Sequence, residues 1–257
     1  MDSTLYDLSA MGWCVAIFCG VVVGMSKCGL AGLGSLAVPL MATVFPAKLS
    51  TGALLPVLII GDAMGVTHFN RHADWRLLTR LMPAALVGIV IGYLLMRQDW
   101  VDDRVIRVSI GVLVLVLLAL NALRERFLAL LPIGEDQSGW PSLVIAIVFG
   151  VIAGITTMLA NAAGPIMLIY LLAMRLPKDA FIGTSAWYFM VLNWCKVPFM
   201  MQLGLINSDS LAFNIKLSPA ILVGGLLGIY FSSRLSNSGF NRLIQVLTVL
   251  AALKLLF

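Results

Sequence analysis

Charged and titratable side chains are scarce in this sequence. Charged residues make up 11% of its 257 positions, and the chain has only two histidines and four cysteines. An ordinary soluble domain carries roughly 25% charged residues, and a folded domain of this size needs a polar exterior. The composition therefore excludes a soluble globular protein.

The residue patterns of several function classes are also missing. The four cysteines have no CxxC spacing and lie in or beside apolar stretches, which is typical of small core residues rather than disulfides or metal ligands. An intramembrane serine protease would pair a G-x-S-x-G motif with a histidine at membrane depth, and the sequence has neither. A voltage sensor would need a run of intramembrane arginines, which is also missing. We expect no enzymatic activity, no metal, no other cofactor and no nucleic-acid partner. The N-terminus lacks the basic region of a cleavable signal peptide.

Apolar residues dominate instead. Hydrophobic residues make up 61% of the chain, and the mean hydropathy is +1.02. A spanning helix needs about 20 mostly apolar residues, so the length has room for roughly six to eight spans. The net charge of +5 comes from basic residues in short loops beside apolar runs, a common topology pattern. We predict an all-α, multi-pass protein of the cytoplasmic (inner) membrane, in contact with lipid.

The two halves of the chain resemble each other. We divide it into a first transmembrane repeat, a polar connector and a second transmembrane repeat, at residues 1–123, 124–139 and 140–257. Glycines and prolines recur in register and in the same order, which indicates a true internal repeat. The clearest matches pair Gly20–Gly24 with Gly150–Gly154, and Pro83–Gly88 with Pro219–Gly224. Small residues at such spacing favour close helix packing, either between the halves or in a homodimer.

Each half opens with an interrupted apolar segment and continues with three transmembrane helices. The interruptions are the small-residue runs Cys28–Gly34 and Leu159–Pro165. Apolar pieces this short are often re-entrant, and their irregular backbone must be buried or line a watery cavity. If each broken segment is a re-entrant hairpin, the two repeats are inverted; if each spans once, eight plain spans result. The distribution of basic residues favours the hairpins and inverted repeats.

Polar residues at the two breaks predict a binding site. Lys27 lies beside the first break, where an ionisable group is costly and usually functional, and freed backbone N–H groups would add positive potential. The alternatives are that Lys27 snorkels to an interface and that Thr157 only joins helices. Matched breaks in two repeats are the best sequence indication of a transporter site. We expect a small anion to bind between them, at Lys27, Gly29, Gly32, Gly34, Thr157, Asn161, Ala162 and Gly164.

A second group of polar residues lies in the helices that follow the breaks. Asp62 interrupts an apolar run, and Asn193 holds its place in the other half. A carboxylate there could take up a proton during transport, or form a structural ion pair with Lys27 or Lys196. His68 is a further candidate, because histidine as a residue type can change charge within the physiological pH range, although a solvated histidine at a loop edge is the alternative. We expect coupling or gating to involve Asp62, His68, Thr184, Asn193 and Lys196.

Taken in order, these motifs resemble the TauE/SafE family of membrane permeases, the sulfite-exporter group. The first half carries Gly24–Gly34, Pro39, Asp62 and Asp74-Trp75. The second half carries Ala160–Pro165, Tyr170–Leu172, Lys178 and Gly183-Thr184. The resemblance extends from about Met11 to Phe257.

The resemblance implies transport of sulfur-containing anions, such as sulfite or organosulfonates, by alternating access coupled to an ion gradient. Many family members carry more glycine in both breaks, whereas here Ser35 follows Gly34, and Asn161, Ala162 and Ala163 precede Gly164. We expect this difference in glycine content to affect which substrate the protein takes rather than its fold. Transport of another small anion and a non-transporting role in membrane assembly are the competing hypotheses.

Overall fold

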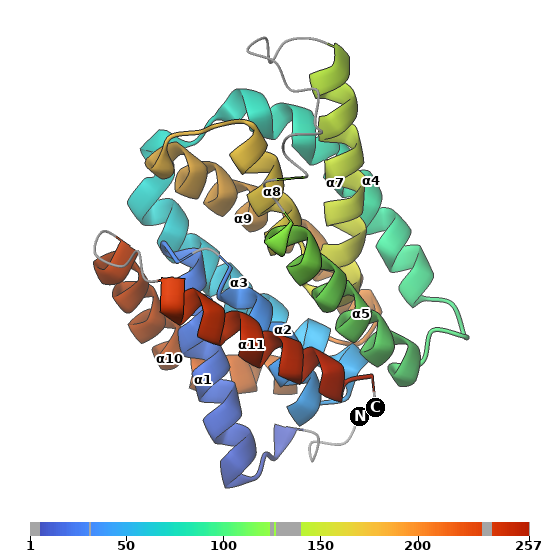
Figure 1. The fold of residues 1–257 in the computed structure, drawn as a ribbon. Coiled ribbons are helices and arrows are strands. Elements are labelled where there is room, and N and C mark those ends of the chain that lie inside the picture. The colour runs from blue at the N-terminus through green and yellow to red at the C-terminus, as the bar shows by residue number, and fades with distance from the viewer. Residues whose placement is uncertain (1–5, 31, 124–125, 127–139, 233–237, 257) are drawn as a thin grey trace.

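The protein is a bundle of helices, shown by a computed structural model (Figure 1). The structure describes residues 6–30, 32–123, 126, 140–232 and 238–256. In this part of the chain there is no strand, and the helices in chain order are α1 (Ala10–Lys27), α2 (Gly34–Val44), α3 (Ala47–Phe69), η2 (Asn70–His72), α4 (Trp75–Met96), α5 (Asp103–Ala122), α7 (Trp140–Ala160), α8 (Gly164–Ala173), α9 (Lys178–Gln202), α10 (Ser208–Ser232) and α11 (Ser238–Lys254). The predicted connector lies outside the described residues, apart from Arg126.

The lengths of these helices confirm an all-α, multi-pass membrane protein. Among the described residues, six helices are long and apolar enough to cross a membrane, namely α1, α3, α4, α5, α7 and α10. By contrast, α2 and α8 have only 11 and 10 residues. At 1.5 Å per residue each is about 16 Å long, roughly half the hydrocarbon thickness of a bilayer. Neither short helix can span by itself.

Each short helix folds back along the long helix before it. Contacts between α1 and α2 pair the residues in reverse order: Gly34 lies by Ser26, Ala37 by Cys19, and Val44 by Gly12. In the second half, Ala160 and Gly164 flank the turn, while the rings of Phe149 and Tyr170 lie 5.7 Å apart further along. Each broken segment is therefore a helical hairpin. We refer to residues 28–33 and 161–163 as the first and second tips.

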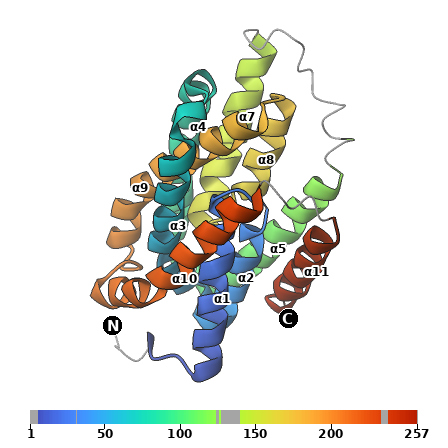
Figure 2. The ribbon, with the colours of Figure 1, turned by 90° about the vertical axis from the view of Figure 1, so that its left-hand side faces the viewer.

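The first helix of each half packs against the fourth helix of the other half. Helix α4 lies along α7, and α1 lies along α10, in both views of the ribbon (Figures 1 and 2). Glycines make both contacts possible. A Cβ at Gly154 would overlap the carbonyl of Ala85, and a Cβ at Gly24 would overlap the carbonyl of Ile221. Ala85 and Ile221 are matched positions in the two repeats, so the sequence repeat corresponds to a repeated helix contact.

Helices α3 and α9, which also correspond to each other, run antiparallel through the middle of the bundle. Near the start of α3, Gly52 lies against Leu205, which follows α9. Near the start of α9, Gly183 lies against Phe69, the last residue of α3. At both positions a Cβ would overlap the neighbouring backbone, so only glycine allows this close approach. The polar residues in the middle of these helices are consequently brought face to face.

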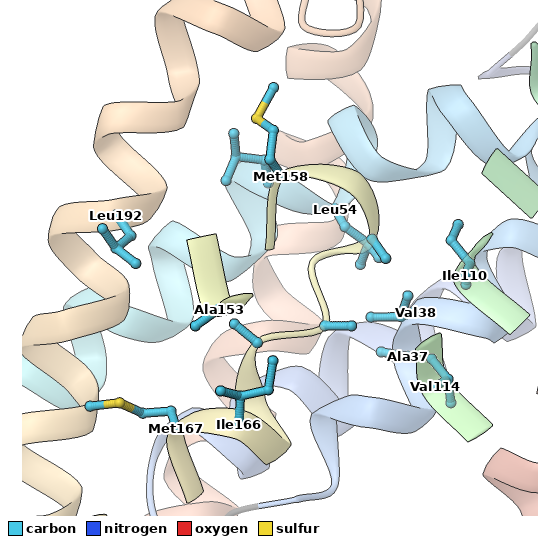
Figure 3. Packing of buried hydrophobic residues seen from close by; sticks show 14 of the residues in the cluster. Ala37, Val38, Leu54, Ile110, Val114, Ala153, Met158, Ile166, Met167 and Leu192 are labelled. Carbon is cyan, nitrogen blue, oxygen red and sulfur yellow. The ribbon is translucent and has the colours of Figure 1, made fainter. Parts of the chain in front are cut away.

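The apolar core surrounds the two short helices. Figure 3 shows Ala37 and Val38 of α2 beside Val114 of α5, with Leu54 of α3 nearby. Ala37 and Leu54 are at most 1% exposed. Large apolar side chains on the outer faces of α4, α5 and α10 are exposed, among them Leu94, Val112 and Leu226. This distribution suits a protein whose exterior faces lipid.

Candidate functional site

A cavity of about 100 Å³ lies where the two hairpin tips meet. A water molecule takes about 30 Å³ of liquid volume, so the space admits a small solute. Its wall includes all the residues predicted to bind the anion: Lys27, Gly29, Gly32, Gly34, Thr157, Asn161, Ala162 and Gly164. Other residues of α1, α2 and α8, together with residues of α3, α5 and α9, complete the wall. The structure thus brings the predicted residues together, and their binding role stays a prediction.

Unusual backbone conformations open the two tips. In the first tip, Gly32 has φ of +98°, a left-handed conformation that glycine adopts without steric cost. In the second tip, Asn161 has φ of +51°, and asparagine is among the few other residues that tolerate this region. Beside it, a Cβ at Gly164 would meet no atom within 4 Å. The start of α8 therefore presents bare backbone to open space.

Lys27, the last residue of α1, points into the bundle rather than toward an interface. Its Nζ lies 2.8 Å from Oδ1 of Asp62 and 4.0 Å from the ring centre of Phe189. The Asp62 side chain is fully buried, whereas that of Lys27 is 14% exposed and reaches the cavity wall. The geometry answers two questions left open by the sequence: Lys27 does not snorkel, and it is the direct ion-pair partner of Asp62.

Asn193 and Lys196 extend this ion pair across the centre of the protein. Asn193 donates from Nδ2 to Oδ2 of Asp62 over 2.7 Å. Its Oδ1 accepts from Nζ of Lys196 over 3.4 Å. Lys196 also donates to Oγ1 of Thr157 over 3.2 Å and to Oδ1 of Asn161. We call these six residues, Lys27, Asp62, Asn193, Lys196, Thr157 and Asn161, the polar network.

The polar network fixes the second tip against α3. Nδ2 of Asn161 donates to the backbone oxygen of Thr51 over 2.8 Å, while its Oδ1 accepts from Lys196. One side chain thereby joins the tip to α3 and to α9. Any displacement of the second tip must break or exchange these bonds.

Two residues predicted to take part in coupling lie apart from the polar network. The hydroxyl of Thr184 accepts from the backbone N–H of Asp74 over 2.8 Å, and the Asp74 carboxylate caps α4 by accepting from Leu77 over 3.1 Å. His68 is exposed near the end of α3, with its ring 4.7 Å from that of Phe69. The structure gives Thr184 a helix-joining contact and places His68 outside the cavity wall.

Sequence reasoning missed several side chains of the cavity wall. Phe189, Ser26, Ser35 and Ser185 all line it. Phe189 sits in an apolar helix where no pattern distinguishes it from a core residue, although it lies over the Lys27 ammonium. The serines next to the breaks could have been found, because hydroxyls beside irregular membrane backbone are plausible donors. Within the described residues, no group of three His, Cys, Asp or Glu could hold a metal ion.

Comparison with known proteins assigns the family. The family described as "Sulfite exporter TauE/SafE" matches residues 16–255. No curated protein and no solved structure matches the chain. The match includes both hairpin tips, the residues that line the cavity and every residue of the polar network. The chain therefore belongs to the sulfite exporter TauE/SafE family of membrane transport proteins.

Proposed function

We propose that this protein transports small sulfur-containing oxyanions, sulfite or organosulfonates, across the cytoplasmic membrane. The observation that carries the proposal is the cavity between the hairpin tips, whose wall holds Lys27, Thr157 and Asn161. A cation, a hydroxyl and an amide at membrane depth suit an anion that must leave water. Membership of the family supports sulfur chemistry in particular.

The proposed mechanism is alternating access, and it is supported by two hairpins that enter the bundle and border one cavity. The antiparallel course of α3 and α9 supports inverted repeats, in which each hairpin enters from its own side of the membrane. Movement of one tip at a time would open the site to one side and then to the other. Asn161, which bonds Thr51 and Lys196, would hold the second tip in the closed position.

The polar network offers a route for coupling to an ion gradient. The Asp62 carboxylate is fully buried; its Oδ1 forms an ion pair with Lys27, and its Oδ2 accepts a hydrogen bond from Asn193. Loss of its charge or of its partners would disturb both hairpins, since the network joins α1 and α7 through α3 and α9. Asp62→Asn should therefore change the pH dependence of transport, and an unchanged profile would make Asp62 a structural residue.

Uptake and efflux of labelled sulfite in proteoliposomes tests the proposed function. The wild-type protein should accelerate exchange above that of protein-free liposomes, and Lys27→Gln should remove at least about nine-tenths of the rate. The matched control is Lys216→Gln, because Lys216 is exposed and lies near Trp13, about 20 Å along α1 from Lys27. This control should transport normally.

Two outcomes would overturn the proposal. No flux across a panel of sulfite, sulfonates, sulfate and carboxylates would favour a non-transporting role in membrane assembly. Flux of carboxylates without flux of any sulfur oxyanion would make the protein a permease for another small anion.

A further inference from the structure

A second cavity, of about 320 Å³, lies between the start of α1 and the start of α10. Helices α1 and α10 run parallel (Figure 2), since Gly20 lies by Leu217 and Met25 lies by Gly228. Both helices therefore begin at the same end of the bundle, and the cavity lies where they begin. Its wall includes charged and aromatic side chains, namely Tyr6, Asp7, Trp13, Asp209, Phe213 and Lys216.

This cavity lies at the level of lipid headgroups. Both α1 and α10 are long and apolar enough to cross a membrane, so their first residues lie near its surface. Tyr6 and Trp13 are of the residue types that are enriched at the membrane interface. Further along the two helices, Ile17 and Leu222 are exposed. Apolar helix faces thus lead from the cavity toward the middle of the bilayer.

The cavity wall carries charges of both signs that do not pair with each other. Asp7 and Lys216 are exposed, and Asp209 is half-buried. Within the described residues, none of these three side chains forms an ion pair. Asp209 and Lys216 are seven residues apart on α10, which places them on one face of the helix with about 10 Å between their backbones. The wall therefore offers two carboxylates and one ammonium group to a ligand.

Aromatic rings close the inner side of the cavity. The ring of the buried Phe213 lies 5.7 Å from that of Tyr6, 5.4 Å from that of Trp13 and 5.2 Å from that of Phe45. Nζ of Lys216 lies 6.0 Å from the ring centre of Trp13. Because the rings pack on one another and Lys216 lies over Trp13, they do not form an open cage for a quaternary ammonium. A cation in this cavity is held instead by the carboxylates, which accept hydrogen bonds from a primary ammonium.

We infer that this cavity binds the headgroup of phosphatidylethanolamine, a lipid with one primary ammonium and one phosphate. Asp7 and Asp209 accept from the ammonium, Lys216 pairs with the phosphate, and the acyl chains follow the exposed apolar faces of α1 and α10. Phosphatidylcholine has no N–H to donate, and phosphatidylglycerol brings a negative charge without a cation. Trp13 lies about 20 Å along α1 from Lys27. The lipid site is therefore separate from the cavity between the tips, and the inference does not depend on the proposed function.

Lipid binding to the purified full-length protein in detergent, followed by native mass spectrometry, tests the inference. The probes are phosphatidylethanolamine, phosphatidylcholine and phosphatidylglycerol with identical acyl chains. At one site, phosphatidylethanolamine should bind about tenfold more tightly than the other two lipids, because only its ammonium donates hydrogen bonds to the carboxylates.

Charge variants should change the lipids' affinities in different directions. Asp7→Asn combined with Asp209→Asn should remove the preference for phosphatidylethanolamine and strengthen phosphatidylglycerol binding about threefold, because the repulsion of its phosphate is lost. Lys216→Gln should weaken all three lipids about threefold, because all carry a phosphate. If the double variant does not fold, Asp7→Asn alone, which lies before α1, should reduce the preference about threefold. Asp99→Asn and Lys254→Gln change exposed charges outside this cavity and should match the wild type.

Two outcomes would overturn the inference. The first is equal affinity for the three lipids, or a preference that neither the aspartate variants nor Lys216→Gln alters. The second comes from competition with soluble O-phosphoethanolamine, which has the same charged groups without acyl chains. It should displace the lipid only at concentrations at least about 100-fold higher. Displacement at a concentration equal to that of the lipid would make the cavity a site for a soluble zwitterion.

Discussion

The two halves of the molecule share their packing but not their chemistry. At the tight helix contacts they agree: Gly24 lies on Ile221 as Gly154 lies on Ala85. At the cavity they differ. Lys27 of the first half corresponds to Thr157 of the second, and Asp62 corresponds to Asn193. Close backbone approach allows only glycine at the contact in both halves, whereas nothing in helix packing requires the polar residues to match.

The lysines show how this asymmetry is built. In the first half the hairpin supplies Lys27, and the following helix has Gly65, where a Cβ would lie 2.8 Å from the Lys27 carbonyl oxygen. In the second half the hairpin supplies Thr157, and the following helix has Lys196 at the position matching Gly65. Each half thus contributes one ammonium group from a different element. The symmetric scaffold thus encloses a polar network whose two halves differ in chemistry.

The largest expected difference between matched positions is at Lys27 and Thr157. Lys27→Met should lower the free energy of unfolding by up to about 3 kcal/mol, because it leaves the buried Asp62 carboxylate without its ion pair. Thr157→Val should cost only about 1 kcal/mol, the value of a typical hydrogen bond. Unfolding in detergent by a graded denaturant measures both.

A double variant provides the control for that difference. Lys27→Met combined with Asp62→Asn removes the unpaired charge and should recover at least half of the lost stability. Equal losses at Lys27 and Thr157, or no recovery in the double variant, would contradict the ion-pair account.

The glycine contacts should respond alike in the two halves. Gly24→Ala and Gly154→Ala each place a Cβ against backbone and should each destabilise the protein by about 1–3 kcal/mol. Gly164→Ala is the matched control, because its Cβ would meet nothing within 4 Å, and its stability should stay within about 0.5 kcal/mol of the wild type. Strongly unequal effects at Gly24 and Gly154 would show that the repeat does not extend to packing.

Thr184 should affect stability and leave the anion site intact. Thr184→Val removes the bond to the Asp74 N–H at the start of α4 and should cost about 1 kcal/mol. Its matched position, Ala53, has no hydroxyl, so this contact belongs to one half alone. Sulfonate affinity should be unchanged, and a large loss of affinity would place Thr184 in the binding machinery.

The smallest effect is expected at His68. Because its side chain is exposed and lies outside the polar network, His68→Gln should change the stability by less than about 0.5 kcal/mol. Transport rates measured across a pH series should follow those of the wild type. A shifted pH profile would show instead that His68 takes part in coupling.

The sequence predicted the fold to the extent that local rules determine it. Apolar length predicted the helices, and glycine-rich interruptions predicted the two hairpin tips, since few other residues adopt the backbone of Gly32. Part of the cavity wall was also predicted, because irregular backbone at membrane depth must be buried or line a watery cavity. The contacts between side chains within the site were not predicted. The choice of Lys27 rather than Lys196 as the ion-pair partner of Asp62 depends on how helices that are distant in the sequence approach each other. The contact between Phe189 and Lys27 depends on the same approach.

Protection of the cavity wall beside each tip from chemical labelling tests the central claim most directly, namely that both hairpins border one anion site. Ser35→Cys and Gly164→Cys each place a thiol on the cavity wall, and the exposed native Cys14 at the start of α1 is an internal control. Propanesulfonate should slow labelling at both new thiols with the same half-maximal concentration and leave Cys14 unaffected. Protection of only one tip, or protection of the two at clearly different concentrations, would contradict a single shared site.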